Sequence, residues 1–596
     1  MLIPLLSLLV GMAIFSVSSL VYAGVPIIKS VPWIFKLKNH HEILLGLALI
    51  SMALMLGIVG YFGYIDGSLL RMIRVFLGIG GLLVMSFPVL HKYRKTHNFI
   101  ARIYSLLTLK TGLTIASLIL LFSIFLISFF DGNYGGDAYM YHLPFAARIW
   151  GITSPEQYIM EDNIEQRLKG FPLLANFLQG FFWKVFQRPE ATNLLAFCSL
   201  ITIISYLKFY LKIPFYLATI SLLAVPMVHM HAARSYIDLP GNVCVAILIL
   251  TTYLLYINKI PFNNKTFLVI IASAAGAANI KFQLIPVVFI ALLAVLPQVI
   301  LKYGKKNEDK KLNLNRIIKS LSLCFIASLI IFATPIKNIA IYQNPFYPVK
   351  VEIAGVVLNY NEAAPNFMHE SLRKLPRHLR WGKSVLEIDA FDDRRPWPWT
   401  LAMDFISWDE AKFGLGGYFG GYVVFNLFLF IYLCVRRFNN QSKIAIILML
   451  IMTAFTPIMP QAYELRYYMY WMIIFVALNC YLVCHNLDRL PDKKVVNAQY
   501  FALVAAGFMF IFMEKTNYFF TKPSFSPFSD YVDANVSEEL FEQIQDSDSV
   551  CLIGKVPHSF LYNSYFHPSR NYSIKAEFDI SPEYVADKCG GRKILK

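Results

Sequence analysis

Residues 112–150 read GLTIASLILLFSIFLISFFDGNYGGDAYMYHLPFAARIW. The part that ends at Phe130 is an apolar run of the length that crosses the hydrocarbon core of a bilayer. Glycines, aspartates, tyrosines and a histidine follow this run at once. A membrane helix that ends in such a mixture indicates polar chemistry at the membrane surface.

The whole chain repeats this apolar pattern. It has 596 residues, of which 57% are hydrophobic and only 15% are charged, whereas soluble chains average about 25% charged residues. We therefore predict an all-α polytopic membrane protein with about fourteen transmembrane helices. The predicted spans are 2–22, 43–64, 72–91, 112–130, 190–210, 213–231, 238–257, 266–280, 283–302, 317–336, 417–436, 442–460, 464–484 and 498–515.

The distribution of positive charge predicts the topology. The net charge of +17 alone would suit a nucleic-acid binder. However, the loops on one predicted side (23–42, 92–111, 207–213, 258–265, 302–319, 436–443 and 485–497) contain 25 Lys and Arg residues, and the short loops on the other side contain 4. Because cytoplasmic loops carry the excess of Lys and Arg, this bias indicates membrane orientation and gives no reason to expect a nucleic-acid partner.

The chain divides into three predicted parts. Residues 1–110 form an N-terminal extension of three membrane helices, 111–515 a membrane core, and 516–596 a small soluble domain. The topology places this domain and the loops 131–189 and 337–416 on the outer, periplasmic or lumenal, side.

The soluble domain is predicted to be α/β. The run SVCLIGK suits a strand, and SEELFEQIQD suits a helix with Ser537 as its N-cap. Cys551 and Cys589 both lie in this outer segment, where a disulfide between them is one of two open alternatives.

The first outer loop carries two amphipathic runs. MYHLPFAARIWG and FPLLANFLQGFFWKVF are too short or too polar to span the membrane, and they suit helices that lie in its interface. Within this loop Asp131 is expected to be a solvated helix terminus. Asp137 follows Gly135 and Gly136, which would allow a sharp turn, and it is a candidate general base.

Further charged and polar residues recur at the predicted outer ends of other spans. A set of cations and carboxylates at this depth suits the handling of a charged lipid headgroup. These residues are His229, His231, Arg234, Asp238, Lys281, Lys337, Asn338, Glu464 and Arg466.

The order of several short motifs resembles the GT-C superfamily of polytopic glycosyltransferases, which includes aminoarabinose transferases and protein O-mannosyltransferases. The motifs are FDGNYGGDAYMYHLPFAARIW, QRLKGFPLLANFLQGFFW, SYIDLP, IKNIAIYQNPFYP and ELRYYMYW, within residues 111–515. The resemblance implies a GT-C-like core and transfer of a sugar from a polyprenyl-phosphate or polyprenyl-diphosphate carrier. Three extra helices precede this core, and Gly170 and Phe171 stand where the family pattern has prolines.

Carried over by this resemblance, Asp137 matches the catalytic loop carboxylate. Arg148 and Lys169 match cations near the lipid phosphate, Asp238 matches the acid of the second outer loop, and Arg466 matches a cation that faces the cavity. Three further residues are expected at the substrate site: Tyr139 and His142 in its wall, and Lys281 as a cation.

The sequence thus predicts a glycosyltransferase that acts at the outer face of its membrane. It would invert the anomeric configuration, because a single displacement occurs at the anomeric carbon. The expected partners are a polyprenyl-linked sugar donor, membrane lipids and a glycan, lipid or protein acceptor. The expected location is a bacterial inner membrane with the site facing the periplasm. No cofactor is firmly implied; a divalent metal ion held by His142 and Asp238 stays open, since no motif such as H-E-x-x-H occurs.

Two alternatives remain at this point. A transporter or flippase of lipid-linked sugars would place charges near the bilayer midplane and show paired broken helices. An O-antigen ligase or polymerase would place its chemistry in the late loop 337–416.

Overall fold

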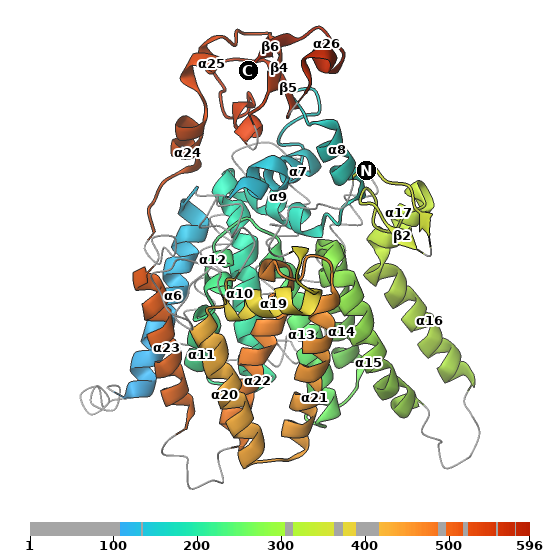
Figure 1. Ribbon diagram of the computed structural model, residues 1–596, viewed down its shortest axis with the longest axis vertical. Coiled ribbons are helices and arrows are strands. Elements are labelled where there is room, and N and C mark those ends of the chain that lie inside the picture. Colours follow the sequence, from blue (N-terminus) through green and yellow to red (C-terminus); the bar gives the residue numbers. More distant parts are fainter. Residues whose placement is uncertain are drawn as a thin grey trace, which may run out of the picture.

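A computed structural model describes residues 108–132, 135–303, 314–353, 355–362, 373–388, 416–486, 496–515, 523–555, 558–578 and 580–596. The three helices predicted before residue 92 lie outside the described residues. Figure 1 shows a bundle of long helices with shorter helices and a small sheet gathered at one end.

Apolar helices occupy the positions of the spans predicted after residue 111. Within the described residues, five helices are long and apolar enough to cross a membrane, or six if one bent pair is counted as a span. This count does not confirm the predicted number of fourteen. The structure shows a mostly helical protein with several candidate membrane helices. The helices are α6 (Leu109–Phe130), α10 (Leu194–Phe209), α11 (Phe215–Leu223), α12 (Pro226–His231), α13 (Asp238–Tyr256), α14 (Asn264–Ile280), α15 (Ile285–Tyr303), α16 (Leu314–Ile331), α17 (Ala333–Tyr342), α20 (Gly420–Arg436), α21 (Asn440–Phe455), α22 (Tyr470–Asn486) and α23 (Ala498–Lys515).

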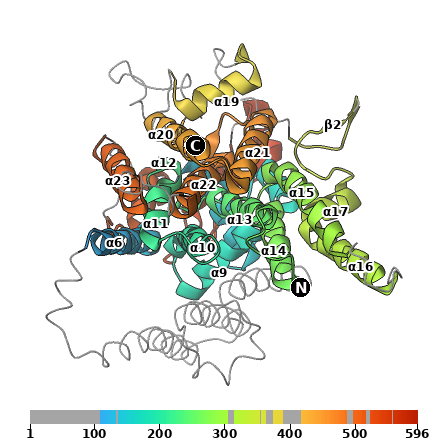
Figure 2. The ribbon, with the colours of Figure 1, turned by 90° about the horizontal axis from the view of Figure 1, so that it is seen from below.

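The bundle has a buried centre and lipid-like edges. Helix α13 lies among α10, α14 and α22 (Figure 2), and 89% of its apolar window is buried. Helix α6 lies at the periphery, where only 28% of its window is buried and Ile119 and Phe122 are more than half exposed. Large apolar side chains at the rim of a bundle are typical of surfaces that face lipid.

Two predicted spans are interrupted rather than continuous. The first divides into α11 and α12 just before Pro226, which lacks the N–H that a continuous helix would need. The second divides into α16 and α17, which are bent by 70°. Asn279 bridges this break: its amide donates to the carbonyl oxygens of Ile330 (3.2 Å) and Ile331 (3.1 Å), and its oxygen accepts from Thr334.

The first outer loop contains the two helices predicted from its amphipathic runs, as α7 (Leu143–Ile149) and α9 (Leu174–Phe186). They pack closely because Gly180 of α9 has no side chain: a Cβ there would lie 2.5 Å from the carbonyl oxygen of Ala146. A π-helical turn, η2 (Ala138–His142), leads into α7. Along the chain, α8 (Asp162–Gly170) follows α7 and precedes α9.

The C-terminal segment forms a small parallel sheet that borrows one strand from this loop. Its strands are β1 (Tyr158–Ile159), β4 (Ser549–Ile553), β5 (Ser573–Glu577) and β6 (Lys593–Leu595), in the order β1-β5-β4-β6. Tyr158 pairs with Ile574, so the domain is not built from residues 516–596 alone.

Local predictions for this domain are confirmed. SVCLIGK contains β4, and Ser537 caps the short helix α25 (Glu538–Glu542) by accepting the N–H of Leu540. Cys551 and Cys589 form a disulfide with their Cα atoms 5.5 Å apart. The remaining named elements are β2 (Glu352–Ile353), β3 (Val356–Val357), α19 (Arg377–Leu386), α24 (Phe528–Asn535) and α26 (Val585–Cys589).

Two carboxylates of the membrane core fasten the segment that leads into the C-terminal domain. Asp131 accepts the N–H of Ser524 (2.9 Å), and Glu190 accepts the N–H of Phe528 (2.8 Å). Asp131 is only 4% exposed, so the expectation of a solvated helix terminus is wrong. This carboxylate is buried because a segment distant in sequence lies over it.

Candidate functional site

Five charged side chains from separate helix ends meet at the end of the bundle that carries the sheet. Asp137 precedes η2, Asp238 begins α13, and Lys281 follows α14. Glu464 and Arg466 lie at the 3-10 turn η6 (Leu465–Tyr468). We refer to these five residues as the charged cluster.

Arg466 joins one half of the cluster. Its guanidinium contacts Asp137 at 3.0 Å and Glu464 at 3.3 Å, and it donates to the hydroxyl of Tyr467 at 3.1 Å. The Arg466 side chain is 10% exposed, so these charge-assisted bonds are partly shielded from water and stronger than surface ion pairs.

Lys281 and Asp238 form the other half as a buried ion pair. The Lys281 ammonium also lies 3.6 Å from the centre of the Tyr467 ring, and the Arg466 guanidinium lies 4.9 Å from the same centre. Cations are attracted to the faces of aromatic rings. Tyr467 therefore links the two halves, a role that its place in an aromatic-rich motif alone did not reveal.

The cluster holds three carboxylates and two cations, so it carries one net negative charge when all five groups are ionised. Both cations already contact carboxylates. A phosphate that binds here would have to take the place of a carboxylate as the partner of Lys281 or Arg466, or wait until a carboxylate is protonated.

Asp137 is both positioned and accessible. Its Oδ2 is held by Arg466, whereas its Oδ1 has no hydrogen-bond partner among the described residues. The Asp137 side chain is 27% exposed, more than the 10% of its partner Arg466. A carboxylate with one fixed and one free oxygen is suited to accept a proton from a substrate hydroxyl.

Glycine is needed at position 135 for a reason other than the sharp turn that the sequence suggested. Neither it nor Gly136 has a positive φ angle, so no left-handed turn is formed there. A Cβ at Gly135 would instead lie 2.1 Å from the hydroxyl of Tyr236. Glycine is thus needed for close approach to Tyr236, whose ring lies 5.9 Å from the Arg466 guanidinium.

His142 lies beside the cluster as a neutral side chain. Its Nδ1 accepts from the amide of Asn176 at 3.1 Å, and that amide also donates to Gln179. Burial lowers the pKa of His142 to about 4, against the opposing effect of Asp137. Burial likewise raises the pKa of Tyr141 well above its usual value, so its hydroxyl stays protonated.

Three predicted site residues lie apart from the cluster. Tyr139 stacks on Tyr531 of α24 with ring centres 4.6 Å apart. Arg148 donates to the carbonyl oxygen of Tyr158 at 2.6 Å, which supports strand β1. Lys169 is exposed at the end of α8. The contacts of Tyr139 and Arg148 link this loop to the sheet and helix α24 of the C-terminal domain, whereas Lys169 faces solvent.

The residues suggested for a metal do not fit one. His142 presents its Nδ1 to Asn176, and Asp238 is paired with Lys281. Among the described residues, no three His, Cys, Asp or Glu side chains gather as metal ligands.

Sequence reasoning did not single out the contact between the two long outer loops. Arg167 of α8 forms a two-pronged ion pair with Glu362, and its guanidinium lies 5.7 Å from the centre of the Tyr141 ring. Only the folded arrangement brings these residues together, because they lie far apart in the chain.

Comparison of the chain with models of protein families, with curated proteins and with solved structures finds no match.

Proposed function

We propose that this chain is an integral-membrane glycosyltransferase. It moves a sugar from a polyprenyl-phosphate or polyprenyl-diphosphate carrier to an acceptor, with Asp137 as the general base. The observation that carries the proposal is the geometry of Asp137: one oxygen fixed by Arg466, one oxygen without a partner among the described residues, and a partly exposed side chain at the end of a bundle of membrane helices.

In this mechanism the acceptor hydroxyl donates a hydrogen bond to Oδ1 of Asp137. As the hydroxyl oxygen attacks the anomeric carbon, its proton passes to Asp137 and the bond from that carbon to the phosphate oxygen breaks. The phosphate leaves on its lipid with the electron pair, and the single displacement inverts the anomeric configuration.

The charge balance of the cluster suits this sequence of events. Proton transfer neutralises Asp137, so Arg466 loses one of the two carboxylate partners that it has among the described residues. At the same moment negative charge develops on the leaving phosphate, and a cation in a partly buried site stabilises it strongly. Arg466 would thus pass from the base to the leaving group within one step.

The proposal includes orientation. The excess of Lys and Arg in the opposite loops supports a cluster on the outer face, which in a bacterial inner membrane is the periplasmic face. The lipid-linked sugar then reaches the site from the membrane, and the acceptor is presented on the outer side.

Asp137→Asn tests the proposal. A general base contributes about a hundredfold or more to rate, so this variant should not restore sugar transfer in cells that lack the chain, and the lipid-linked donor should accumulate. Envelope glycans and polyprenyl-linked sugars are extracted and compared by mass spectrometry. Asp162→Asn is the matched control, because Asp162 lies in the same outer loop with 66% of its side chain exposed.

The asparagine variant must be present at the normal level for the comparison to count. Full restoration of transfer by Asp137→Asn would remove Asp137 from the chemistry. Loss of transfer by Asp162→Asn as well would show that the loop tolerates no change and that the effect is not specific to the base.

A further inference from the structure

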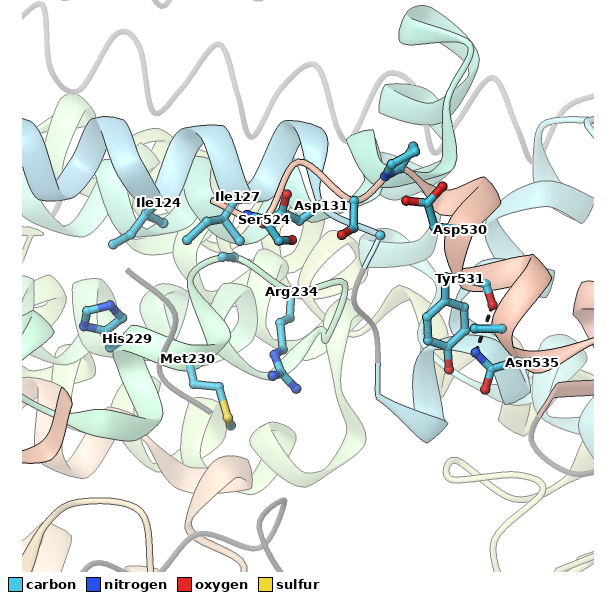
Figure 3. A pocket seen from close by; sticks show the side chains of 15 residues that line it. Ile124, Ile127, Asp131, His229, Met230, Arg234, Ser524, Asp530, Tyr531 and Asn535 are labelled. Atoms are coloured by element: carbon cyan, nitrogen blue, oxygen red, sulfur yellow. Dashed lines mark hydrogen bonds between the residues drawn. The ribbon is translucent and has the colours of Figure 1, made fainter. Parts of the chain in front are cut away.

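A cavity of about 490 Å³ lies between the outer end of α6, helix α12 and helix α24 of the C-terminal domain (Figure 3). We call it the α6–α24 cavity. Its volume is within the range of about 300–1,000 Å³ that is usual for small-molecule sites. The charged cluster does not contribute to its walls, so this space is separate from the proposed base.

The walls change from apolar to polar along the cavity. Ile124, Ile127 and Met230 lie at one end together with His229, and Asp530 and Tyr531 lie at the other, with Asp131 and Arg234 between them, as Figure 3 shows. The apolar end comes from membrane helices and the polar end from the C-terminal domain. Such a gradient fits an amphipathic molecule whose tail stays near the membrane and whose head points outward.

Two buried polar groups at the cavity have hydrogen-bonding capacity left over. Asp131 is 4% exposed, and its Oδ1 has no partner among the described residues; His229 is 3% exposed, and the same holds for its Nε2. Buried polar atoms are almost always hydrogen-bonded, and leaving one unpaired costs about 1–3 kcal/mol. Both residues line the cavity, and Asp131 lies between its two ends, so the unpaired oxygen of Asp131 indicates that a polar molecule binds there.

The charges select the chemistry of that molecule. Two carboxylates, Asp131 and Asp530, line the cavity together with one cation, Arg234. Hydroxyl groups donate to carboxylate oxygens, so both carboxylates can hold a polyol, whereas an ionised phosphate has no such proton to donate and is repelled by them. The chemistry is therefore that of a neutral saccharide.

The cavity also adjoins the loop of the proposed base. Tyr531 lines the cavity, and its ring stacks on Tyr139, two residues beyond Asp137. We propose that the α6–α24 cavity binds the saccharide head of a membrane-anchored acceptor and so delivers its hydroxyl to the charged cluster. This inference rests on the proposed glycosyltransferase function and names the substrate class on the acceptor side.

The test uses the full chain in lipid nanodiscs and an octyl β-glucoside that carries a diazirine in its alkyl chain. After irradiation, mass spectrometry maps the labelled peptides. We expect labelling at Ile124–Ile127 and Met230 that unlabelled octyl β-glucoside competes away and octyl phosphate does not. Asp530→Asn should weaken this competition by about tenfold, the loss of one charge-assisted hydrogen bond.

Two variants on α24 sharpen the result. Asp533→Asn is the matched control, because Asp533 is exposed on the same helix and does not line the cavity, and competition should stay unchanged. Ala534→Trp places a large side chain into the cavity from an exposed position and should abolish labelling there.

Three outcomes would overturn the inference. Labelling that is unaffected by Ala534→Trp, or spread along the lipid-facing positions Ile115 to Phe122, would show membrane partitioning only. Preferential competition by octyl phosphate would assign the cavity to the donor phosphate. The same labelling with Asp137→Asn separates the two proposals, since loss of the base should leave binding intact.

Discussion

The buried pair of Lys281 and Asp238 offers the sharpest test of the charged cluster. Their exposed fractions are 9% and 2%. Removing one partner of a buried pair leaves an uncompensated charge and costs about 3–5 kcal/mol. The positive charge of Arg466 also stabilises the Asp238 carboxylate. We therefore expect Lys281→Met to lower the free energy of unfolding by about 3 kcal/mol, at the lower end of that range.

The double variant Lys281→Met/Asp238→Leu should recover most of this loss, because replacing a whole buried pair by apolar residues is often close to neutral. The free energy of unfolding is measured by titrating the purified chain in mixed micelles with a denaturing detergent and following tryptophan fluorescence. Lys588→Met is the control: its pair with Asp162 is exposed, and its loss should cost less than about 1 kcal/mol.

The reasoning is refuted if Lys281→Met is as stable as the wild type, or if the two single losses simply add in the double variant. Recovery of stability without recovery of sugar transfer would show that the pair is needed for activity and dispensable for folding.

The remaining predictions concern single side chains. Burial lowers the pKa of His142 to about 4, so below about pH 6.5 the imidazole gains a proton in the unfolded chain but stays neutral in the folded chain. The free energy of unfolding should therefore fall by up to about 3 kcal/mol as the pH drops toward 4. Thermal unfolding of the wild type and of His142→Gln across this window should show a shallower dependence of stability on pH for the variant. Gly132→Ala would place a Cβ 2.7 Å from the backbone of Phe528, so the segment that leads into the C-terminal domain should shift. Limited proteolysis should then cut this segment faster, and an unchanged digestion pattern would contradict the close contact. Asn279→Ala removes the bridge across the break between α16 and α17 and should cost about 3 kcal/mol in the same detergent titration, whereas a loss below about 1 kcal/mol would mean that water satisfies those backbone groups.

The positions of the membrane helices follow from the apolar runs, because burial in lipid or protein selects apolar residues locally along the chain. Their interruptions do not. The break that Asn279 stabilises depends on a contact between helices far apart in sequence. A hydropathy pattern registers composition, and it contains no information about such a partner.

The site shows the same division. The sequence indicates Asp137 and Arg466 as separate polar residues at helix ends, and only the structure shows that they form an ion pair. Tyr467 was hidden among other aromatic residues that suit a membrane interface, since its position between two cations is a property of the fold. Tyr139, Arg148 and Lys169 share the local pattern of the others, but Tyr139 packs on Tyr531, Arg148 supports strand β1, and Lys169 is exposed.

Strand β1 has a consequence for how the protein is made. The loop that carries Asp137 completes its edge only when Tyr158 pairs with Ile574, a residue that is synthesised after every described membrane helix. A ribosome that stopped just beyond α23 would release a chain with its helices in place and this loop unfinished. Assembly of this end of the bundle is therefore a late event in biogenesis, and it requires the final segment to have reached the same side of the membrane as the loop.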